Sequence, residues 1–346
     1  GMSSSWTLTA LPLFVWMGEI LFRTKLSENL FKGLSPWLAK LPGGLIHVNV
    51  VGCALFAAIS GSSAATVATV GKMSIPELRQ RKYPEKLLLG SLAGSGTLGL
   101  LIPPSIILII YGVTIEDSIA KLFMAGIFPG IMIALIFMSY VVIWSIMNKN
   151  LMPKLSVNFS LNRKIEESKQ LVPVIILIVS VIGSIYTGIA TATEAASLGV
   201  IGALFLSFFQ GTLSKESFEL SVLGATKTSC MIAFILAGST FLSLAMGFTG
   251  LPRNLAIWIQ NMSLSPYTLL FVLTIFYIIL GMFLDGISAV VLTMAIIEPM
   301  IRQAGFDMIW FGIYLVIVVE MAQITPPVGF NLFLLQGMAK KDMGFI

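Results

Sequence analysis

Two pairs of adjacent prolines interrupt long apolar segments, and they constrain the fold of this chain more than any other feature. Pro103 and Pro104 lie in "LGLLIPPSIILIIYG", and Pro326 and Pro327 lie in "EMAQITPPVGFNLFLL". Proline lacks an N–H, clashes with the carbonyl four residues earlier and drives the preceding residue out of the helical region. In lipid, freed backbone groups are tolerated only where protein buries them or where they line a polar cavity. One such pair is an ordinary kink, whereas two matched pairs indicate a built site.

The composition places the chain in a membrane. Of the 346 residues, 57% are hydrophobic and 11% are charged, which is less than half the charged share of a typical soluble domain. Several apolar runs approach the roughly 20 residues that a transmembrane helix needs, and they do not alternate as barrel strands do. One histidine and two cysteines, with no CxxC pair, give no metal-ligand spacing.

We expect an all-α polytopic membrane protein. The apolar runs predict spans over 6–22, 85–115, 121–147, 171–188, 190–210, 220–248 and 307–338, of which 85–115 and 307–338 are broken at the prolines. Helical spacing of apolar residues predicts an amphipathic interfacial helix over 26–41 and a second interfacial piece over 251–262. The shorter paired runs predict two re-entrant hairpins, 44–59 with 62–75 and 266–283 with 287–301.

The order of span, interfacial helix, hairpin and broken helix occurs twice, which predicts an internal duplication. An offset of 225 residues places Gly61 on Gly286, and an offset of 223 places Arg79 on Arg302 and the first proline pair on the second. Five crossings separate matching elements, so we expect inverted repeats. With the hairpins returning to their own side, 17 of the 21 Lys and Arg lie on one face, which is cytoplasmic by the positive-inside rule.

The expected organisation has four parts: repeat 1 over 1–147, a cytoplasmic linker over 148–169, two spans over 170–216 and repeat 2 over 217–346. The partner of the span at 121–147 would begin near residue 344. The two spans of the third part would have partners before residue 1. We therefore expect a chain truncated at both ends, with the last span of repeat 2 missing.

Oxygen-bearing side chains gather at the first predicted hairpin and break. The hairpin turns at Ser60-Gly61-Ser62-Ser63, and Ser95 and Thr97 precede the first proline pair. Oxygen ligands suit hard cations, and helix N-termini suit carboxylates. In the same stretch, "GSLAGSGTLG", close helix packing accounts for Gly90 and Gly99.

The second hairpin turns at Asp285, an acid at membrane depth that is a functional candidate by default. We expect it to bind a cation with Ser288 and Thr325; the alternative is an N-cap of the returning helix. Further candidates for lining a substrate cavity are Glu194, Glu320, Gln323 and Asn331. Glu194 is equally suited to cap its own helix, and Glu320 and Gln323 to form a packed polar bridge. Glu19 is expected to pair with a nearby base or to reach an interface.

Five ordered motifs, "PLFVWMGEIL", "AAISGSSAATVATVG", "GSGTLGLLIPPSIILIIYG", "FLDGISAVVL" and "ITPPVGFNLF", resemble the large membrane subunit of TRAP (tripartite ATP-independent periplasmic) transporters, the DctM-like family. The resemblance implies sodium-coupled import of organic acids, such as C4-dicarboxylates or sialic-acid-like acids, across the bacterial inner membrane. It implies Na⁺ as the coupling ion and no organic cofactor. It also implies two partners, a periplasmic substrate-binding protein and a small membrane (Q) subunit. Both hairpins and both broken helices would form a transport domain that moves as an elevator.

The resemblance also implies two sodium sites. The first would comprise Ser60, Gly61, Ser62 and Ser63, with backbone from Gly94, Ser95 and Thr97. The second would comprise Asp285, Gly286 and Thr325, with backbone near Val328. Because hairpin 1 carries no acid where hairpin 2 has Asp285, we expect the sites to differ in charge.

Three other functions compete with this interpretation. A binding-protein-independent divalent-anion/sodium symporter can share the inverted hairpin architecture. An intramembrane enzyme would need a catalytic dyad or metal ligands within the bilayer, and the single His47 without an HExxH motif argues against it. A purely structural module would tolerate replacement of the polar groups at the breaks.

Overall fold

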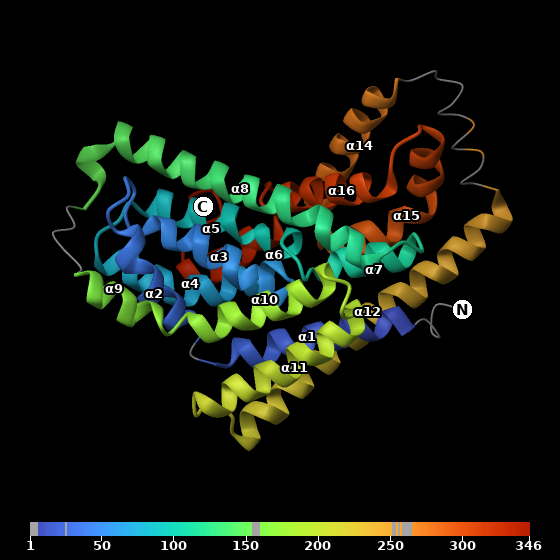
Figure 1. The fold of residues 1–346 in the computed structure, drawn as a ribbon. Helices are drawn as coiled ribbons and strands as arrows, with labels where there is room; N and C mark the ends of the chain where they lie inside the picture. The colour runs from blue at the N-terminus through green and yellow to red at the C-terminus, as the bar shows by residue number, and fades with distance from the viewer. Residues whose placement is uncertain (1–5, 25, 154–159, 251–253, 255–256, 258–264) are drawn as a thin grey trace.

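The computed structural model describes residues 6–24, 26–153, 160–250, 254, 257 and 265–346 (Figure 1). In the first part of the chain the helices are η2 (Trp6–Thr9), α1 (Ala10–Phe22), α2 (Leu26–Leu38), α3 (Ile46–Ser60), α4 (Ser63–Gln80), α5 (Glu85–Gly96), α6 (Leu98–Leu101), α7 (Ile106–Thr114) and α8 (Ile119–Met147). In the second part they are η3 (Lys149–Leu151), α9 (Leu161–Ser168), α10 (Val172–Tyr186), α11 (Ala192–Phe209), α12 (Lys215–Thr249), α14 (Pro266–Gly281), α15 (Gly286–Gln303), α16 (Met308–Gln323) and α17 (Phe330–Ala339). The predicted interfacial piece at 251–262 lies almost wholly outside the described residues.

All the regular structure in the described residues is helical, so the predicted all-α polytopic class is confirmed. Within them, five helices are long and apolar enough to cross a membrane, and α9 with α10, bent by 54°, gives a sixth candidate. In the most apolar stretch of each segment, 89% of the residues of Glu85–Thr114 are buried, against 17% for α8 and 18% for α12. The first broken helix therefore lies inside the protein, while α8 and α12 present apolar faces outward.

Both predicted helix breaks are present. The helix that starts at Glu85 is interrupted at Thr97 and again between Leu101 and Ile106, and the second one is interrupted between Gln323 and Phe330. The peptide bond between the two prolines is cis in each break. The extended conformation of Ile102 before the first pair follows from the clash of a proline ring with its preceding residue.

Side-chain caps define where the half-helices begin. Ser62 accepts from the Ala65 amide at the start of α4, and Ser105 accepts from the Leu108 amide at the start of α7. Asp285 accepts from two amides at the start of α15. Serine and aspartate are preferred at this position because a short side-chain oxygen satisfies amides that lack an intrahelical partner.

In each half of the chain, the half-helix that follows the proline pair packs on the returning hairpin helix of the other half. Helix α4 packs on α17, and α15 packs on α7. Arg79, near the end of α4, donates to the carbonyl of Ala339 at the end of α17 (2.8 Å), and Arg302, near the end of α15, donates to the carbonyl of Ile115 at the end of α7 (3.5 Å). Each arginine also pairs with an acid close to it in sequence, Glu85 or Glu298. This reciprocal packing agrees with the repeat prediction, which stays a prediction.

The polar stretch predicted as a linker over 148–169 contains a helix. Helix α9 packs on the interfacial helix α2, where Trp37 Nε1 donates to Ser168 Oγ (2.7 Å) and Lys164 Nζ lies 5.0 Å from the centre of the Trp37 ring. The sequence missed this helix because a short charged run lacks a hydrophobic face wide enough to be distinguished from a loop.

Gly99, but not Gly90, is required for close packing. A Cβ at Gly99 would lie 2.5–2.6 Å from backbone atoms of Ser62 and Ser63, whereas a Cβ at the exposed Gly90 would meet nothing within 4 Å. The packing interpretation is therefore supported for Gly99 and wrong for Gly90. Gly99→Ala should destabilise the protein by about 1–3 kcal/mol, because backbone atoms cannot move aside cheaply. Gly90→Ala, in the same broken helix, should stabilise it slightly, by about 0.5–1 kcal/mol.

Thermal unfolding of both variants in detergent measures this difference. Equal melting temperatures for the two variants would contradict the contact between α6 and the first hairpin tip.

Candidate functional site

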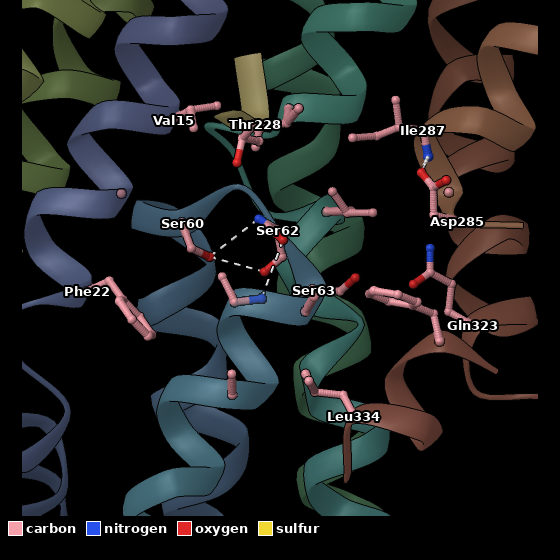
Figure 2. A pocket seen from close by; sticks show the side chains of 18 of the residues that line it. Val15, Phe22, Ser60, Ser62, Ser63, Thr228, Asp285, Ile287, Gln323 and Leu334 are labelled. Atoms are coloured by element: carbon pink, nitrogen blue, oxygen red, sulfur yellow. Dashed lines mark hydrogen bonds between the residues drawn. The ribbon is translucent and has the colours of Figure 1, made fainter. Parts of the chain in front are cut away.

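The two hairpin tips and both broken helices line one cavity of about 540 Å³ (Figure 2). Its wall combines Ser60, Ser62 and Ser63 of the first tip with Asp285, Gly286 and Ile287 of the second, Leu100 and Ile106 beside the first break, and Gln323 and Phe330 beside the second. Helix α1 and helix α12 close the remaining side, the latter with Thr228 and Met231. Pockets of this size accommodate small organic ligands.

The first tip is held on the first break by its glycine. Gly61 has a positive φ of 57°, and a Cβ there would lie 2.8 Å from the carbonyl oxygen of Pro104. The Gly61 carbonyl accepts from the Ile106 amide (3.3 Å), which is one of the donors left without a partner at the start of α7. The hairpin tip thus satisfies part of the backbone that the proline pair frees.

Hydroxyl groups complete the first tip. The hydroxyls of Ser60 and Thr66 are 2.9 Å apart, and both donate to the Ser62 carbonyl, at 3.2 and 2.8 Å. At the break itself, the Ser105 hydroxyl donates to the Leu100 carbonyl. The Ser62 carbonyl is fully used by these hydroxyls and the Thr66 amide, whereas each hydroxyl retains acceptor capacity, so the tip gathers several oxygen atoms in a small volume.

The second tip is organised around Asp285. One carboxylate oxygen accepts from the Ile287 and Ser288 amides, both at 3.1 Å, and the other accepts from the Ser288 hydroxyl. The N-cap alternative is therefore confirmed, and the half-buried carboxylate also lines the cavity. A Cβ at Gly286 would lie 2.7 Å from Gln323 Nε2, so this tip packs directly on the end of α16.

The second break is exposed, unlike the first. Pro326, Pro327 and Val328 are exposed, whereas Pro103 and Pro104 are buried beneath α8. Thr325 is half-buried and its hydroxyl donates to the Met321 carbonyl (2.7 Å). Neither Thr325 nor Val328 is among the residues that line the cavity.

The backbone proposed for the first sodium site lies behind the cavity rather than on its wall. Ser95 and Thr97 are buried, and their hydroxyls donate to the carbonyls of Ser91 and Gly94. Gly94 faces Phe137 of α8, at 3.3 Å from the position of a Cβ. The contact with the hairpin tip is made instead by Gly99, which the sequence indicated only as a packing residue.

Of the four candidate cavity-lining residues, Gln323 lines the cavity and three do not. Glu194 is exposed and completes a capping box with Thr191 at the start of α11, so its placement disagrees with a cavity role. Glu320 is 3% exposed and Asn331 is fully buried, and neither side chain has a hydrogen-bond partner. Both lie beside the second break, Glu320 in the last turn of α16 and Asn331 in the first turn of α17.

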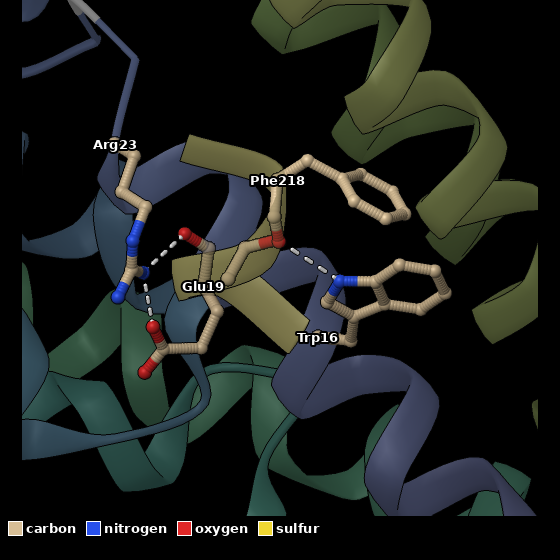
Figure 3. Close-up of polar contacts among 5 residues, drawn as sticks. Trp16, Glu19, Arg23 and Phe218 are labelled. Carbon is tan, nitrogen blue, oxygen red and sulfur yellow. Dashed lines mark hydrogen bonds and ion pairs between the residues drawn. The ribbon is translucent and has the colours of Figure 1, made fainter. Parts of the chain in front are cut away.

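Helix α1 contributes a wall that the sequence did not identify (Figure 3). Glu19 lines the cavity, and its carboxylate pairs with Arg23, which also donates to the Glu19 carbonyl (2.8 Å). A Cβ at Gly224 of α12 would lie 2.5 Å from the Glu19 carboxylate, so the acid packs directly on that helix. One turn earlier, Trp16 Nε1 donates to Ser221 Oγ (3.2 Å). The expected pairing of Glu19 with a base is thus confirmed.

The charge of the cavity wall is negative. Among the described lining residues, Glu19 and Asp285 are acidic and none is Lys, Arg or His. Arg23 offsets Glu19, which leaves Asp285 as the acid without a cationic partner. The wall is mostly apolar, and its one uncompensated carboxylate together with the serine hydroxyls of the first tip favours a hard cation.

Sequence comparisons place these features in a family. The model of the family described as "Tripartite ATP-independent periplasmic transporter, DctM component" matches residues 1–346. The C4-dicarboxylate TRAP transporter large permease protein DctM of Pseudomonas aeruginosa is 32% identical, over 99% of this chain and 80% of its own length. The sialic acid TRAP transporter large permease protein SiaM of Vibrio cholerae is 30% identical, over 96% and 78%. The isethionate TRAP transporter permease protein DctMQ of Oleidesulfovibrio alaskensis is 33% identical, over 97% and 53%.

Water access to the cavity can be tested by cysteine labelling. In a Cys230→Ser background, where the remaining Cys53 is buried, Ala64→Cys should react with a water-soluble maleimide at least ~10 times faster than Val67→Cys. Ala64 lines the cavity, whereas Val67, one turn further along α4, is fully buried. Similar labelling rates at both positions, measured by mass spectrometry, would show that the tip is not open to water.

Proposed function

The chain belongs to the DctM family of TRAP transporter large permease proteins, and from this premise we propose that it imports an organic acid across the bacterial inner membrane in symport with sodium. It is a multi-pass membrane transporter rather than an enzyme. The observation that carries the proposal is the single cavity lined by both hairpin tips and by residues beside both proline breaks. In transporters, broken helices beside the bilayer midplane supply the oxygens for Na⁺ and the helix N-termini for an anionic substrate.

Electrostatics supports sodium coupling. At an effective dielectric constant of about 20, an anion about 4 Å from an unpaired carboxylate is repelled by about 4 kcal/mol. Asp285 stands in the cavity wall without a cationic side chain beside it. A sodium ion bound at the second tip removes this repulsion, so binding of the cation favours binding of the anion. That mutual dependence is the thermodynamic basis of symport.

The relatives support the substrate class. Their names specify C4-dicarboxylates, sialic acid and isethionate, which are all small organic anions. A cavity of about 540 Å³ has room for such a molecule. The α4 N-terminus at the first tip, which is capped by an uncharged serine, offers backbone amides near the cavity that are suited to its acidic group.

The family also supports two partners, a periplasmic substrate-binding protein and a small membrane subunit. The alternative, a symporter that needs no binding protein, predicts uptake by the membrane protein alone. Uptake into proteoliposomes with and without the cognate binding protein distinguishes the two. Dependence on the added protein supports the TRAP mechanism, and independence supports the alternative.

For the transport movement we propose an elevator. The hairpins and broken helices pack on one another, while α1 packs on α11 and α12 at the side of the cavity (Figure 1). The moving part would comprise α3–α7 and α14–α17, and the fixed part α1 and α10–α12. The boundary runs through the cavity, between the hairpin tips and the wall that contains Glu19.

Asp285→Asn tests the sodium site without removing the helix cap. Asparagine caps helices about as well as aspartate, so folding should be unaffected, whereas Asp285→Ala should lose about 1 kcal/mol of stability. The charge is removed in both variants. Sodium-driven uptake by the full-length transporter should therefore fall at least ~10-fold in each, as expected for loss of a charged ligand worth about 1.4 kcal/mol or more.

The apparent sodium affinity and the melting temperature are measured on the same preparations. Wild-type uptake with an unchanged sodium dependence in Asp285→Asn would remove this carboxylate from the coupling site.

A further inference from the structure

We propose that Glu320 is the acidic ligand for the cation bound at the first hairpin tip, reaching it from the other half of the chain. The inference rests on the proposed sodium coupling and extends it by assigning a ligand. It identifies the source of negative charge for a tip that has no acid of its own.

The two tips differ in the residue that caps the returning helix. Helix α15 begins after Asp285, whereas α4, which is also 18 residues long, begins after Ser62. In the second tip the Ser288 hydroxyl donates to the Asp285 carboxylate. In the first tip the capping residue Ser62 carries no charge, so Ser63 has no carboxylate within its own hairpin.

Glu320 provides a carboxylate at this place. The Ser63 side chain lies within electrostatic range of the Glu320 carboxylate but makes no hydrogen bond of normal geometry to it. In Figure 2, Ser63 points across the cavity toward Gln323, which is one turn beyond Glu320 on the same face of α16. A serine hydroxyl near the start of the returning helix thus faces a carboxylate in both halves. Ser288 faces Asp285 within its own hairpin, and Ser63 faces Glu320 across the halves.

The Glu320 side chain lacks the partners that its burial requires. It is 3% exposed, and neither carboxylate oxygen accepts a hydrogen bond. An isolated buried carboxylate costs several kcal/mol unless a counter-charge or hydrogen bonds offset the lost hydration. No described Lys, Arg or His pairs with Glu320, so its charge is either offset by a bound cation or removed by protonation, and the sodium response of the purified protein distinguishes the two.

A second buried side chain without hydrogen-bond partners lies beside the second break. Asn331, in the first turn of α17, is fully buried, and its amide oxygen and nitrogen both lack partners. Helix α17 packs on α4, whose first residue is Ser63. Carboxylate, carboxamide and hydroxyl oxygens are all hard ligands, which suit Na⁺ rather than a soft metal.

The test is sodium-dependent thermal stabilisation of the purified full chain, with NaCl replaced by KCl at constant ionic strength. Glu320→Gln keeps the shape and removes the charge. The concentration of Na⁺ that gives half of the maximal stabilisation should rise at least ~10-fold in this variant. In KCl the variant should melt at or above the wild-type temperature, because an unpaired buried charge has been removed. Glu216→Gln, at an exposed acid in the first turn of α12, is the control and should keep the wild-type sodium response.

A purely structural role for Glu320 predicts the opposite pattern, a lower melting temperature in both salts with an unchanged sodium midpoint. That result would overturn the proposal while leaving sodium-coupled transport intact. If the wild type itself shows no preference for NaCl over KCl, both the ligand assignment and the sodium coupling fail. If wild type and variant differ as expected but proteoliposomes take up no organic acid, the ligand assignment stands and the proposed function fails.

Glu320→Asp keeps the experiment decisive if the glutamine variant does not fold. The shorter side chain retains the charge but withdraws it by one methylene group. The proposal requires a weakened sodium response that is still specific over potassium. A sodium midpoint equal to that of the wild type would contradict it.

Discussion

Within a membrane every backbone N–H and C=O needs a partner from the protein itself, and the two proline pairs create groups that their own helices cannot satisfy. At the first break, part of this requirement is met from outside the helix. The Gly61 carbonyl accepts from the Ile106 amide, and the missing side chain of Gly61 lets the tip approach Pro104. The same contact fixes the position of Ser62 and Ser63 on the cavity wall. The hydrogen bond that satisfies a backbone amide at the first break therefore also positions the first tip in the candidate site.

The two halves meet this constraint in different ways, and the difference has functional consequences. The first break is buried under α8, and its tip carries hydroxyls without an acid. The second break is exposed at Pro326 and Pro327, and its tip carries Asp285, which both caps a helix and faces the cavity. The two cation sites that we propose at these tips would have different sources of charge, Asp285 within its own hairpin and Glu320 from the other half of the chain. Unequal affinities would give sodium ions a defined order of binding.

The positions of the helix breaks and of the half-helix starts were predictable from the sequence, because they depend on local chemistry. The proline pairs located both breaks, and the short polar side chains at Ser62 and Asp285 marked where the half-helices begin. Contacts between distant segments were not predictable in the same way. The packing of Glu19 against Gly224, the pairing of Trp37 with Ser168 and the exposed position of Gly90 depend on tertiary arrangement. The sequence made Glu320 a candidate for lining the cavity or for a packed polar bridge. Its burial without a hydrogen-bond partner in the structure argues against the polar bridge.

Amide hydrogen exchange, compared in NaCl and KCl, tests most directly whether the tips and breaks bind a cation as one unit. The account predicts that sodium slows exchange together in four segments, at residues 60–65, 97–106, 285–289 and 320–329, because ligation holds the tips on the breaks. Exchange in α11, which lies away from the cavity, should be the same in both salts. Identical exchange of the four segments in the two salts, or protection of one hairpin alone, would contradict a cation site shared between the halves.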